Sequence, residues 1–392
     1  MSPNPQRYLK QGRREGVAED TLQNALAVME RLRATDPRIT PLLSLRHLSD
    51  MTGVSYLHLR DLVGRRVRRT YKVFYLRKRV PGRTATRMIC KPNSTLLSIQ
   101  QWIVRDILRF TRAHGSSYAF HPGSRPFEAA EEHCGCKWLF KVDLQDFFHT
   151  ISEGRVTQVF AEIGFNRLLS FELARLVTVG CERANRPDPT DRWTKIPYYQ
   201  TTSEGFLPQG APTSPMISNL VMHRTDERLA DIAAASGMRY SRYADDLAFS
   251  GGADTSRAAM LRLKRAVLRT LNEDGFTPNL RKTVLRGPGT RRIVLGMLVD
   301  GDKPRLSREF KDMIRLHLHY LTSPDHGPAI HALRRRTSIS GIFHHVRGLI
   351  SWAETVEKEY GANALAQFRE VDWPPLRPDL DFGPDAEWDE NE

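Results

Sequence analysis

The sequence predicts an α+β protein, and two observations support this fold class. Residues 15–65, 307–321 and 340–369 carry apolar side chains at helical spacing, whereas the middle of the chain alternates helical stretches with short strand-forming runs. A strand–turn–strand pattern surrounds a tight Ala-Asp-Asp sequence within residues 238–250. Hydrophobic residues make up 40% of the 392 residues, which is enough to bury a core.

The N-terminal part of the chain is expected to change from helices to strands. Between residues 15 and 65, helical spacing is set by Leu22, Leu26, Met29, Leu32, Leu45, Leu48, Leu57 and Leu62. Strands are expected at residues 71–76 and 86–90, with a basic, glycine-containing turn at residues 77–83 between them. Residues 96–112 have one apolar face and are expected to be helical.

The later elements follow the same two patterns. Helices are expected at residues 155–181, 214–235, 256–274, 307–321 and 340–369. Strands are expected at residues 139–144, 238–243, 247–250 and 283–286, with a further hairpin at 293–304. The segment 184–204, rich in Pro, Asp and Thr, is interpreted as a loop or small insertion, and residues 379–392 as an acidic flexible tail.

The charge of the chain indicates a polyanionic partner. The formal net charge is +14 and the isoelectric point is about 9.8, with arginine supplying most of the positive charge. Such a balance favours binding to nucleic acid, and the planar guanidinium suits phosphate. No apolar run is long enough to span a bilayer, so no membrane partner is expected. Residues 1–14 are polar and basic and lack the apolar core of a signal peptide, so a cytoplasmic location is expected.

The cysteines do not form the pattern of a disulfide scaffold or a zinc site. Four cysteines are scattered along the chain. His133, Cys134 and Cys136 lie close together, but the spacing is tight and no second pair of ligands follows. We therefore interpret these cysteines as structural or incidental thiols.

Two acidic stretches have the chemistry of a two-metal site. Asp143 ends a strand-like apolar run, and Asp245 and Asp246 lie in the turn of the predicted hairpin. Transfer of a nucleotide to a hydroxyl uses two divalent ions about 3.5–4 Å apart. Mg²⁺ requires oxygen ligands, which carboxylates at the ends of adjacent strands supply. Either stretch alone is also compatible with an ordinary turn or strand end.

The order of the motifs resembles that of reverse transcriptases, and the motif sequences resemble those of the retron enzymes. The similar segments are residues 71–102 (fingers), 143–148 (motif A), 207–215 (motif B), 240–250 (motif C), 275–282 (motif D) and 291–300 (motif E). They cover roughly residues 70 to 300 in the expected order. The resemblance implies a right-hand polymerase fold with fingers, a palm built on an antiparallel sheet, a helical thumb and a helical N-terminal extension.

The resemblance also implies domain boundaries and site residues. The expected domains are a helical N-terminal extension (1–65), fingers and palm (66–304), a helical thumb (305–372) and an acidic tail (373–392). Catalytic roles fall on Asp143, Asp245, Asp246 and Lys282, with Lys282 as general acid. Two Mg²⁺ ions, with Mn²⁺ as an alternative, would be held by Asp143, the Leu144 carbonyl, Asp245 and Asp246. Contacts to the dNTP fall on Lys78, Arg87, Phe148 as the steric gate, Gln209 and Gly210.

The retron resemblance further implies an RNA partner and a product. The enzyme would use a cognate noncoding RNA as template and primer, through a guanosine 2′-hydroxyl, and make RNA-linked single-stranded DNA. Contacts to the RNA or RNA/DNA hybrid fall on His133, Arg334, Arg335, Arg336, His344 and Arg347. His133 belongs to Ala-Ala-Glu-Glu-His, where retron enzymes have Asn-Ala-x-x-His, and Val294-Leu295-Gly296 stands where they have Val-Thr-Gly. A role in anti-phage defence with a separate effector protein would follow.

Two alternatives remain open. The first is another defence-associated or group II intron-like reverse transcriptase that works without a retron RNA, although neither a maturase extension nor an endonuclease Cys/His cluster follows the expected thumb. The second is a basic RNA-binding protein with an inactive polymerase fold. The intact acidic set disfavours the second, because carboxylates beside phosphate repel it unless a metal bridges them.

Overall fold

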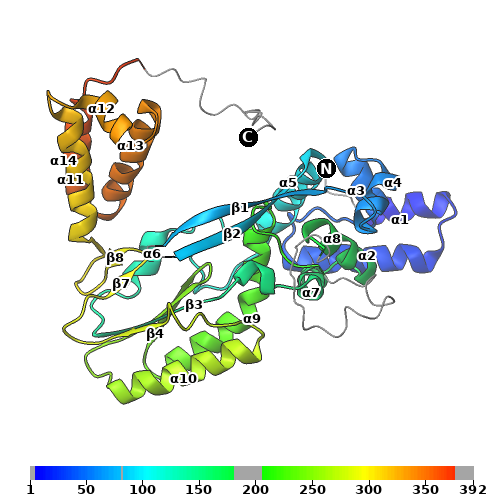
Figure 1. Ribbon diagram of the computed structural model, residues 1–392. Coiled ribbons are helices and arrows are strands. Elements are labelled where there is room, and N and C mark those ends of the chain that lie inside the picture. Colours follow the sequence, from blue (N-terminus) through cyan, green and yellow to red (C-terminus); the bar gives the residue numbers. More distant parts are fainter. Residues whose placement is uncertain (1–4, 81–82, 181–204, 376–392) are drawn as a thin grey trace, which may run out of the picture. The chain divides into compact units, whose positions relative to one another are not determined.

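The computed structural model describes residues 5–80, 83–180 and 205–375, with the side chains of residues 78–85 outside the described part (Figure 1). Two compact units are distinguished by their internal contacts. The first comprises residues 1–125, 140–249 and 255–285, and the second comprises residues 126–139, 250–254 and 286–392. The predicted fingers–palm and thumb boundaries stay a prediction, since this division follows packing and not function.

The N-terminal part of the first unit is helical, as expected. Its helices are α1 (Pro5–Arg14), α2 (Glu19–Thr35), α3 (Leu45–Thr52) and α4 (Tyr56–Val63). Ser44 and Ser55 cap α3 and α4 by accepting hydrogen bonds from the backbone N–H groups of His47 and His58. Leu22, Leu32 and Leu48 are at most 1% exposed and pack into a core, as predicted, whereas Leu57 is 74% exposed and does not. Helix α1 was not predicted.

A long antiparallel hairpin follows these helices. Strand β1 (Tyr71–Val80) pairs with β2 (Arg83–Pro92) along its whole length, from Tyr71 opposite Pro92 to Val80 opposite Arg83. Both strands are longer than predicted, because most of the residues expected to form the turn continue the ladder. Helix α5 (Ser94–Asp106) and the 3₁₀ turn η1 (Leu108–Phe110) replace the single helix expected at 96–112.

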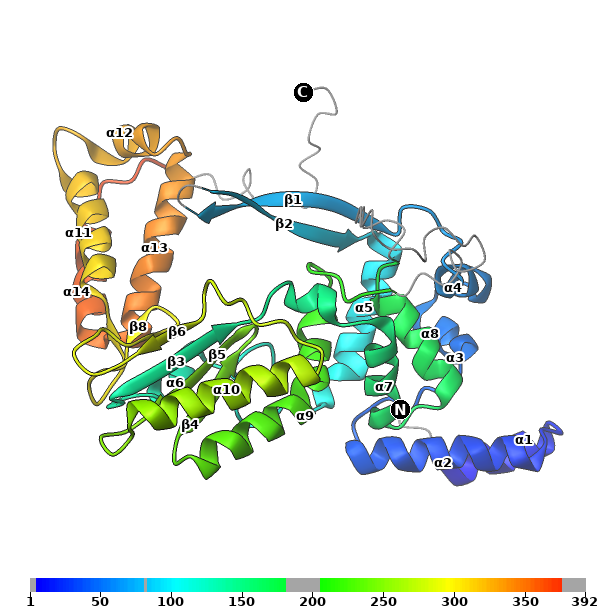
Figure 2. The same ribbon diagram turned by 60° about the horizontal axis from the view of Figure 1, so that its bottom comes forward.

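A four-stranded sheet forms the centre of the first unit. Its order is β4 (Arg239–Tyr243), β5 (Asp246–Gly251), β3 (Trp138–Asp143) and β6 (Val284–Arg286). Helices α9 (Ser214–Ala235) and α10 (Arg257–Glu273) run side by side along one face of this sheet (Figure 2). Helices α7 (Glu153–Ile163) and α8 (Arg167–Val177) pack against each other. The predicted loop at 184–204 lies outside the described residues.

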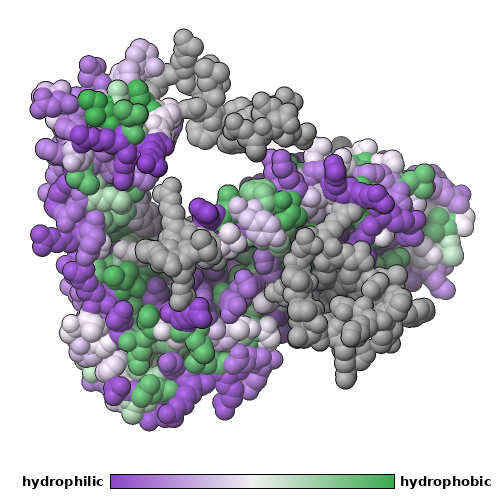
Figure 3. Space-filling view, in the orientation of Figure 1, coloured by the Kyte–Doolittle hydropathy of each residue, from purple (hydrophilic) through white to green (hydrophobic). Residues whose placement is uncertain are grey.

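The second unit joins a small sheet to four helices. Strands β7 (Ile293–Val294), β8 (Met297–Leu298) and β9 (Arg305–Leu306) pair antiparallel in that order. The helices are α11 (Arg308–Thr322), α12 (Gly327–Arg334), α13 (Ile339–Val356) and α14 (Lys358–Arg369). Their surface is largely hydrophilic in the space-filling view (Figure 3). Helix α12 was not predicted, and the helix expected at 340–369 is divided at Glu357.

Two short segments from the middle of the chain complete the second unit. Helix α6 (Pro126–Glu131) leads into Gly135, whose N–H donates to Gly301 O at 2.8 Å. Lys137 N–H donates to Gly251 O at 2.9 Å, and the Nδ1 of buried His133 lies 2.7 Å from Ser250 Oγ. The three segments are therefore fastened by backbone and side-chain bonds. None of the described helices is long and apolar enough to cross a membrane.

Candidate active site

Two acidic segments meet at one end of the central sheet. Strand β3 buries Phe140 and Val142, which are at most 1% exposed, and ends at Asp143, which is 6% exposed. Leu144 N–H donates to Asp245 O at 3.0 Å. The end of β3 is thereby held beside the β4–β5 turn, and the structure brings together the three aspartates that the sequence singled out.

The β4–β5 turn has an unusual backbone conformation. Ala244 lies in the left-handed region with φ of 57°, a conformation that L-residues other than glycine rarely adopt. It is buried at 7% exposure, whereas Asp245 and Asp246 are half-buried. The turn therefore presents two consecutive carboxylates toward partly open space from a fixed base.

The electrostatics of the turn favour a cation. Burial raises the pKa of Asp245, and the charges of Asp143 and Asp246 raise it further. Burial also raises the pKa of Asp246, as does the charge of Asp143, while Lys141 and Lys282 lower it. Like charges held close together disfavour ionisation, and a divalent cation would relieve that repulsion.

A loop after α10 holds both oxygens of Asp143. Lys282 Nζ donates to Asp143 Oδ1 at 2.8 Å, and Asn279 Nδ2 donates to Oδ2 at 3.1 Å. Asn279 N–H also donates to Asp143 O at 2.7 Å. Burial opposes the charge of Lys282, but the hydrogen bond to Asp143 and the neighbouring carboxylates together raise the pKa of the lysine. Asn279 lies within the predicted motif D, residues 275–282, but the sequence assigns it no role, and only its packing reveals the contact with Asp143.

The donor set fits a hard cation such as Mg²⁺. Three carboxylates and the Leu144 carbonyl offer only oxygen, which Mg²⁺ and Mn²⁺ prefer. Within the described ranges, no group of three or more His, Cys, Asp or Glu side chains is already arranged around a metal position. Both oxygens of the Asp143 carboxylate accept hydrogen bonds, from Lys282 and Asn279.

A cavity of about 300 Å³ adjoins these carboxylates. Seven of the predicted site residues line it, namely Arg87, Asp143, Leu144, Phe148, Gln209, Asp245 and Lys282. The Phe148 ring lies 5.4 Å from that of Phe147 and 6.2 Å from that of Phe120. Phe120 was missed by the sequence analysis, since no pattern around it distinguishes it from other aromatic residues. Lys78 lies on β1, but its side chain is outside the described residues.

Gly210 lies where the hairpin approaches the segment before α9. Cys90 N–H donates to Gln209 O at 2.7 Å, which joins β2 to this segment. A Cβ at Gly210 would lie 2.8 Å from Ile89 Cγ2 and 3.3 Å from Cys90 O, and the backbone φ is +110°. Only glycine satisfies both conditions, and the close approach that it permits is to strand β2. Gly210 is not among the residues that line the cavity, so its contact with the nucleotide stays a prediction.

The predicted RNA contacts occupy two different environments. His133 is fully buried, which places it in the interior and not on a surface that RNA could reach. Arg334, Arg335, Arg336 and His344 are exposed, and Arg347 is half-buried. Arg335 Nη2 lies 3.0 Å from His317 Nε2, and Arg347 Nη1 donates to Ser351 Oγ at 2.7 Å. The exposed arginines belong to the second unit.

Comparison with known families defines the class of the protein. The family described as reverse transcriptase (RNA-dependent DNA polymerase) matches residues 76–298. The chain therefore belongs to the reverse transcriptase family, and it is an RNA-directed DNA polymerase with the right-hand fold expected from the motifs.

The curated relatives are retron enzymes, which confirms the resemblance seen in the motifs. Retron Ec86 reverse transcriptase of Escherichia coli is 29% identical over 325 residues, which cover 82% of this chain and 92% of the relative. Retron Mx162 reverse transcriptase of Myxococcus xanthus is 28% identical over 367 residues, which cover 89% and 74%. Retron Ec83 reverse transcriptase of Escherichia coli is 28% identical over 310 residues, which cover 76% and 89%.

Two solved structures are similar at low sequence identity. One is a foamy viral protease–reverse transcriptase in complex with double-stranded DNA, with a TM-score of 0.37, 16% identity and coverage of 77% of this chain and 44% of that one. The other is telomerase from Candida albicans in complex with a fragment of telomeric RNA, with a TM-score of 0.40, 10% identity and coverage of 74% and 56%.

Proposed function

We propose that this reverse transcriptase serves a retron. It uses a cognate noncoding RNA as both template and primer, begins synthesis from an internal guanosine 2′-hydroxyl, and makes single-stranded DNA joined to RNA. Its biological role is anti-phage defence with a separate effector protein. The main support is that the chain combines a three-carboxylate site with an adjoining cavity of nucleotide size, and that its alignments with retron enzymes cover most of the length of those relatives.

The proposed catalytic residues are the three aspartates and Lys282. Asp143, Asp245 and Asp246, with the Leu144 carbonyl, would hold two Mg²⁺ ions, and bound ions would supply activation of the attacking hydroxyl and stabilisation of the departing pyrophosphate. Lys282 is charged and exposed, and it donates a proton to the leaving pyrophosphate as the new phosphodiester bond forms. Asn279 keeps the Asp143 carboxylate oriented through its side-chain amide.

The proposed nucleotide pocket explains the preference for deoxyribose. Phe148 is the steric gate, whose ring fills the space that a 2′-hydroxyl would need. Gln209, which lines the cavity, and the neighbouring Gly210 contact the sugar and base, and the absence of a side chain at Gly210 lets this segment lie close to Ile89 and Cys90 of β2. Arg87 is exposed on β2 at the rim of the cavity and, with Lys78, binds the triphosphate through charge-assisted hydrogen bonds.

The proposed grip on the RNA/DNA hybrid comes from the helices of the second unit. Arg334, Arg335 and Arg336 form a continuous exposed basic run at the end of α12, and His344 and Arg347 lie on α13. Such a run neutralises phosphates without reading sequence. His133 acts indirectly, by fastening the segment after α6 to Ser250.

The test is to purify the protein from its native locus and sequence the nucleic acid bound to it, with and without RNase treatment. A defined small RNA joined to single-stranded DNA is the expected result, and it identifies the template and the priming site together. The matched control is the Asp245→Asn, Asp246→Asn variant, which should carry the RNA without DNA. Protein-linked DNA, or activity only on an added primer–template, would contradict the retron proposal and leave the polymerase intact.

A further inference from the structure

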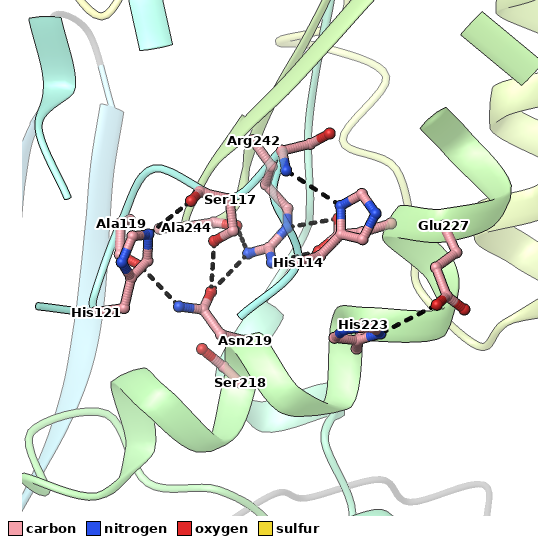
Figure 4. Close-up of polar contacts among 12 residues, drawn as sticks. His114, Ser117, Ala119, His121, Ser218, Asn219, His223, Glu227, Arg242 and Ala244 are labelled. Carbon is pink, nitrogen blue, oxygen red and sulfur yellow. Dashed lines mark hydrogen bonds and ion pairs between the residues drawn. The ribbon is translucent and has the colours of Figure 1, made fainter. Parts of the chain in front are cut away.

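A buried ion pair lies beneath the β4–β5 turn. Arg242 is 0% exposed and is the largest fully buried side chain among the described residues. Its Nε and Nη2 donate to the two carboxylate oxygens of Asp226 on α9 at 2.8 and 2.6 Å. Its Nη1 donates to Ala244 O at 3.1 Å and to Asn219 Oδ1 at 3.0 Å (Figure 4). One guanidinium thereby connects a helix, a strand and the turn that carries Asp245.

Asn219 extends this network to a second segment. It is 0% exposed, and its Oδ1 also accepts a hydrogen bond from Ser117 Oγ at 3.0 Å. Its Nδ2 donates to Ala119 O at 2.7 Å (Figure 4). Since arginine is only a donor, the atom facing Arg242 must be the amide oxygen, which fixes the amide orientation. Asn219 therefore bridges Arg242 and the backbone just before Phe120.

Each end of the network reaches a strained residue. Ala244 has φ of 57° and Phe120 has φ of 68°, and neither is glycine. Such conformations cost about 1–3 kcal/mol and persist only where the surroundings impose them. The network bonds the carbonyl of Ala244 itself and the carbonyl of Ala119, the residue that precedes Phe120. Backbone bonds from Tyr118 N–H to Arg242 O and from Arg242 N–H to Ser116 O hold the same two segments together.

The two strained residues form two walls of one cavity. Ala244 and Phe120 both line the space beside Asp143 and Phe148. The Phe120 ring lies 6.2 Å from the Phe148 ring at an angle of 50°. A shift of the Ala119–Phe120 backbone therefore moves a neighbour of the gate, whereas a shift of Ala244 moves the metal-binding carboxylates.

We propose that Asn219 and Arg242 are positioning residues, which fix the β4–β5 turn and its carboxylates relative to Phe120. We further propose that Phe120 supports the Phe148 gate in discriminating deoxyribose from ribose. This inference rests on the proposed roles of Asp245, Asp246 and Phe148. A buried ion pair alone is weak support for stability, because desolvation offsets most of the attraction. Its value here lies in geometry, because the network bonds the carbonyl of Ala244, which lines the cavity, and the carbonyl of Ala119, which precedes the cavity-lining Phe120.

Asn219→Asp distinguishes the contacts of Asn219 with Arg242 and Ser117 from its contact with Ala119 O. The variant keeps an oxygen that accepts from Arg242 and Ser117, but it replaces the amide donor to Ala119 O with a second acceptor. The carbonyl and carboxylate then repel each other, so the Phe120 wall should move while the turn keeps its bond to Arg242. Phe120→Ala tests the same wall from an exposed position, where loss of folding is not expected.

The experiment measures kcat and KM for one dNTP and its ribonucleotide on an added primer–template, with the Mg²⁺ concentration for half-maximal rate and the melting temperature. Both variants should lower dNTP-over-rNTP selectivity by about tenfold. Half-maximal Mg²⁺ should stay within about twofold of wild type, because the turn is undisturbed. His223→Gln is the matched control, since His223 lies on α9 one turn from Asn219 and its ring pairs with Glu227 at 3.5 Å.

Two different failures are distinguishable. If the wild-type protein incorporates no dNTP with Mg²⁺, the assigned catalytic site is wrong. If the wild type is active and selective but both variants keep wild-type selectivity, the positioning role is wrong, whatever their melting temperatures. A uniform fall in rate with dNTP and rNTP alike, with unchanged selectivity, would likewise reduce the network to a packing role.

Discussion

Lys282 and Asp143 are 139 positions apart in the chain and are joined by a hydrogen bond of 2.8 Å from Nζ to Oδ1. The side chain of Asp143 is 8% exposed, whereas that of Lys282 is 61% exposed. The lysine thus reaches the carboxylate from solvent and is free to leave it when a nucleotide enters. The same ammonium can neutralise the site before substrate binds and face the triphosphate afterwards.

Replacing Lys282 by Ala should slow the chemical step by about a hundredfold, the usual size of a general acid contribution. Lys282→Arg keeps the ion pair with Asp143, but arginine is a poor proton donor. This variant should therefore be as stable as the wild type while its chemical step stays as slow as that of Lys282→Ala. Single-turnover incorporation of one dNTP measures the step. Equal rates in the wild type and both variants would remove Lys282 from the chemistry.

The double variant Asp245→Asn, Asp246→Asn should make no DNA while binding RNA with near wild-type affinity. Asparagine keeps the shape of the turn but is a much weaker ligand for Mg²⁺ than a carboxylate. Primer extension and filter binding on the same preparation give the two readouts. Measurable extension at the wild-type rate would show that these residues do not hold the metal ions.

Phe148→Ala should admit ribonucleotides by opening the space beside the sugar. Selectivity for dNTP over rNTP should fall by roughly 10- to 100-fold, as expected when a pocket loses a steric wall. Competition between labelled dNTP and rNTP in one extension reaction measures this ratio. Phe147→Leu serves as a comparison, because Phe147 is buried in the core beside Phe148 and Phe276.

Gly210→Ala should impair nucleotide binding more than folding. The new methyl would lie 2.8 Å from Ile89 Cγ2 in a backbone with φ of +110°, so β2 must shift away from Gln209. We expect KM for dNTP to rise by about tenfold. Gly237→Ala is the control, because its φ is +64° and a Cβ there meets nothing within 4 Å. Equal KM values in the two variants would contradict the proposed close approach.

The stability of the second unit should fall as the pH is lowered from about 6.5 to about 4. Burial, and after it the charges of Arg335, His331 and His345, together lower the pKa of His317 to about 4. Arg335 donates to His317 Nε2, so the ring is neutral and donates from Nδ1 to His331 Nε2 at 2.9 Å. Because the folded state disfavours protonation, the stabilisation is complete above the unfolded pKa and is lost as protons bind. The loss is on the order of 3 kcal/mol.

Hydrogen exchange of the α11 and α12 amides at pH 7 and pH 5 measures this effect. His317→Gln should flatten the dependence on pH, whereas His319→Gln, an exposed change on the same helix, should preserve it. Identical protection at both pH values in the wild type would show that the ring is not held neutral. This prediction concerns the stability of the helices and not the chemistry of the active site.

The sequence was most informative where local chemistry and tertiary packing agree. Helix α9 begins and ends at the predicted residues, Ser214 and Ala235, because Pro215 fixes its first turn and a Ser-Gly pair follows its last. The hairpin around Asp245 was also predicted closely, since strand formers flank the turn on both sides. The three aspartates were found through the order of motifs and not through any single residue.

Packing decided the parts that the sequence did not predict. The helix expected at 340–369 is divided because the Glu357 carboxylate accepts hydrogen bonds from Leu306 N–H at 2.9 Å and Lys311 Nζ at 2.5 Å. The contacts of Asn219 and Asn279 depend on segments far apart in the chain, so no local pattern reveals them. Helix α12 begins with Gly-Pro, a pair typical of a turn, and only His331 and Ala332 of this helix are buried, so the sequence carries no clear apolar face that would predict it.

The second unit is assembled from three separate stretches of chain, and this limits how the gene can be cut. A fragment that starts at Arg286 keeps helices α11 to α14 but loses helix α6 and Gly135, whose backbone bonds to Gly301. It also loses Trp138, whose ring lies against Gly287. An exchange of this unit between two such polymerases therefore requires that all three stretches be exchanged together. A swap of the C-terminal stretch alone would leave its contacts with residues 126–139 and 250–254 to be made by segments of the other protein.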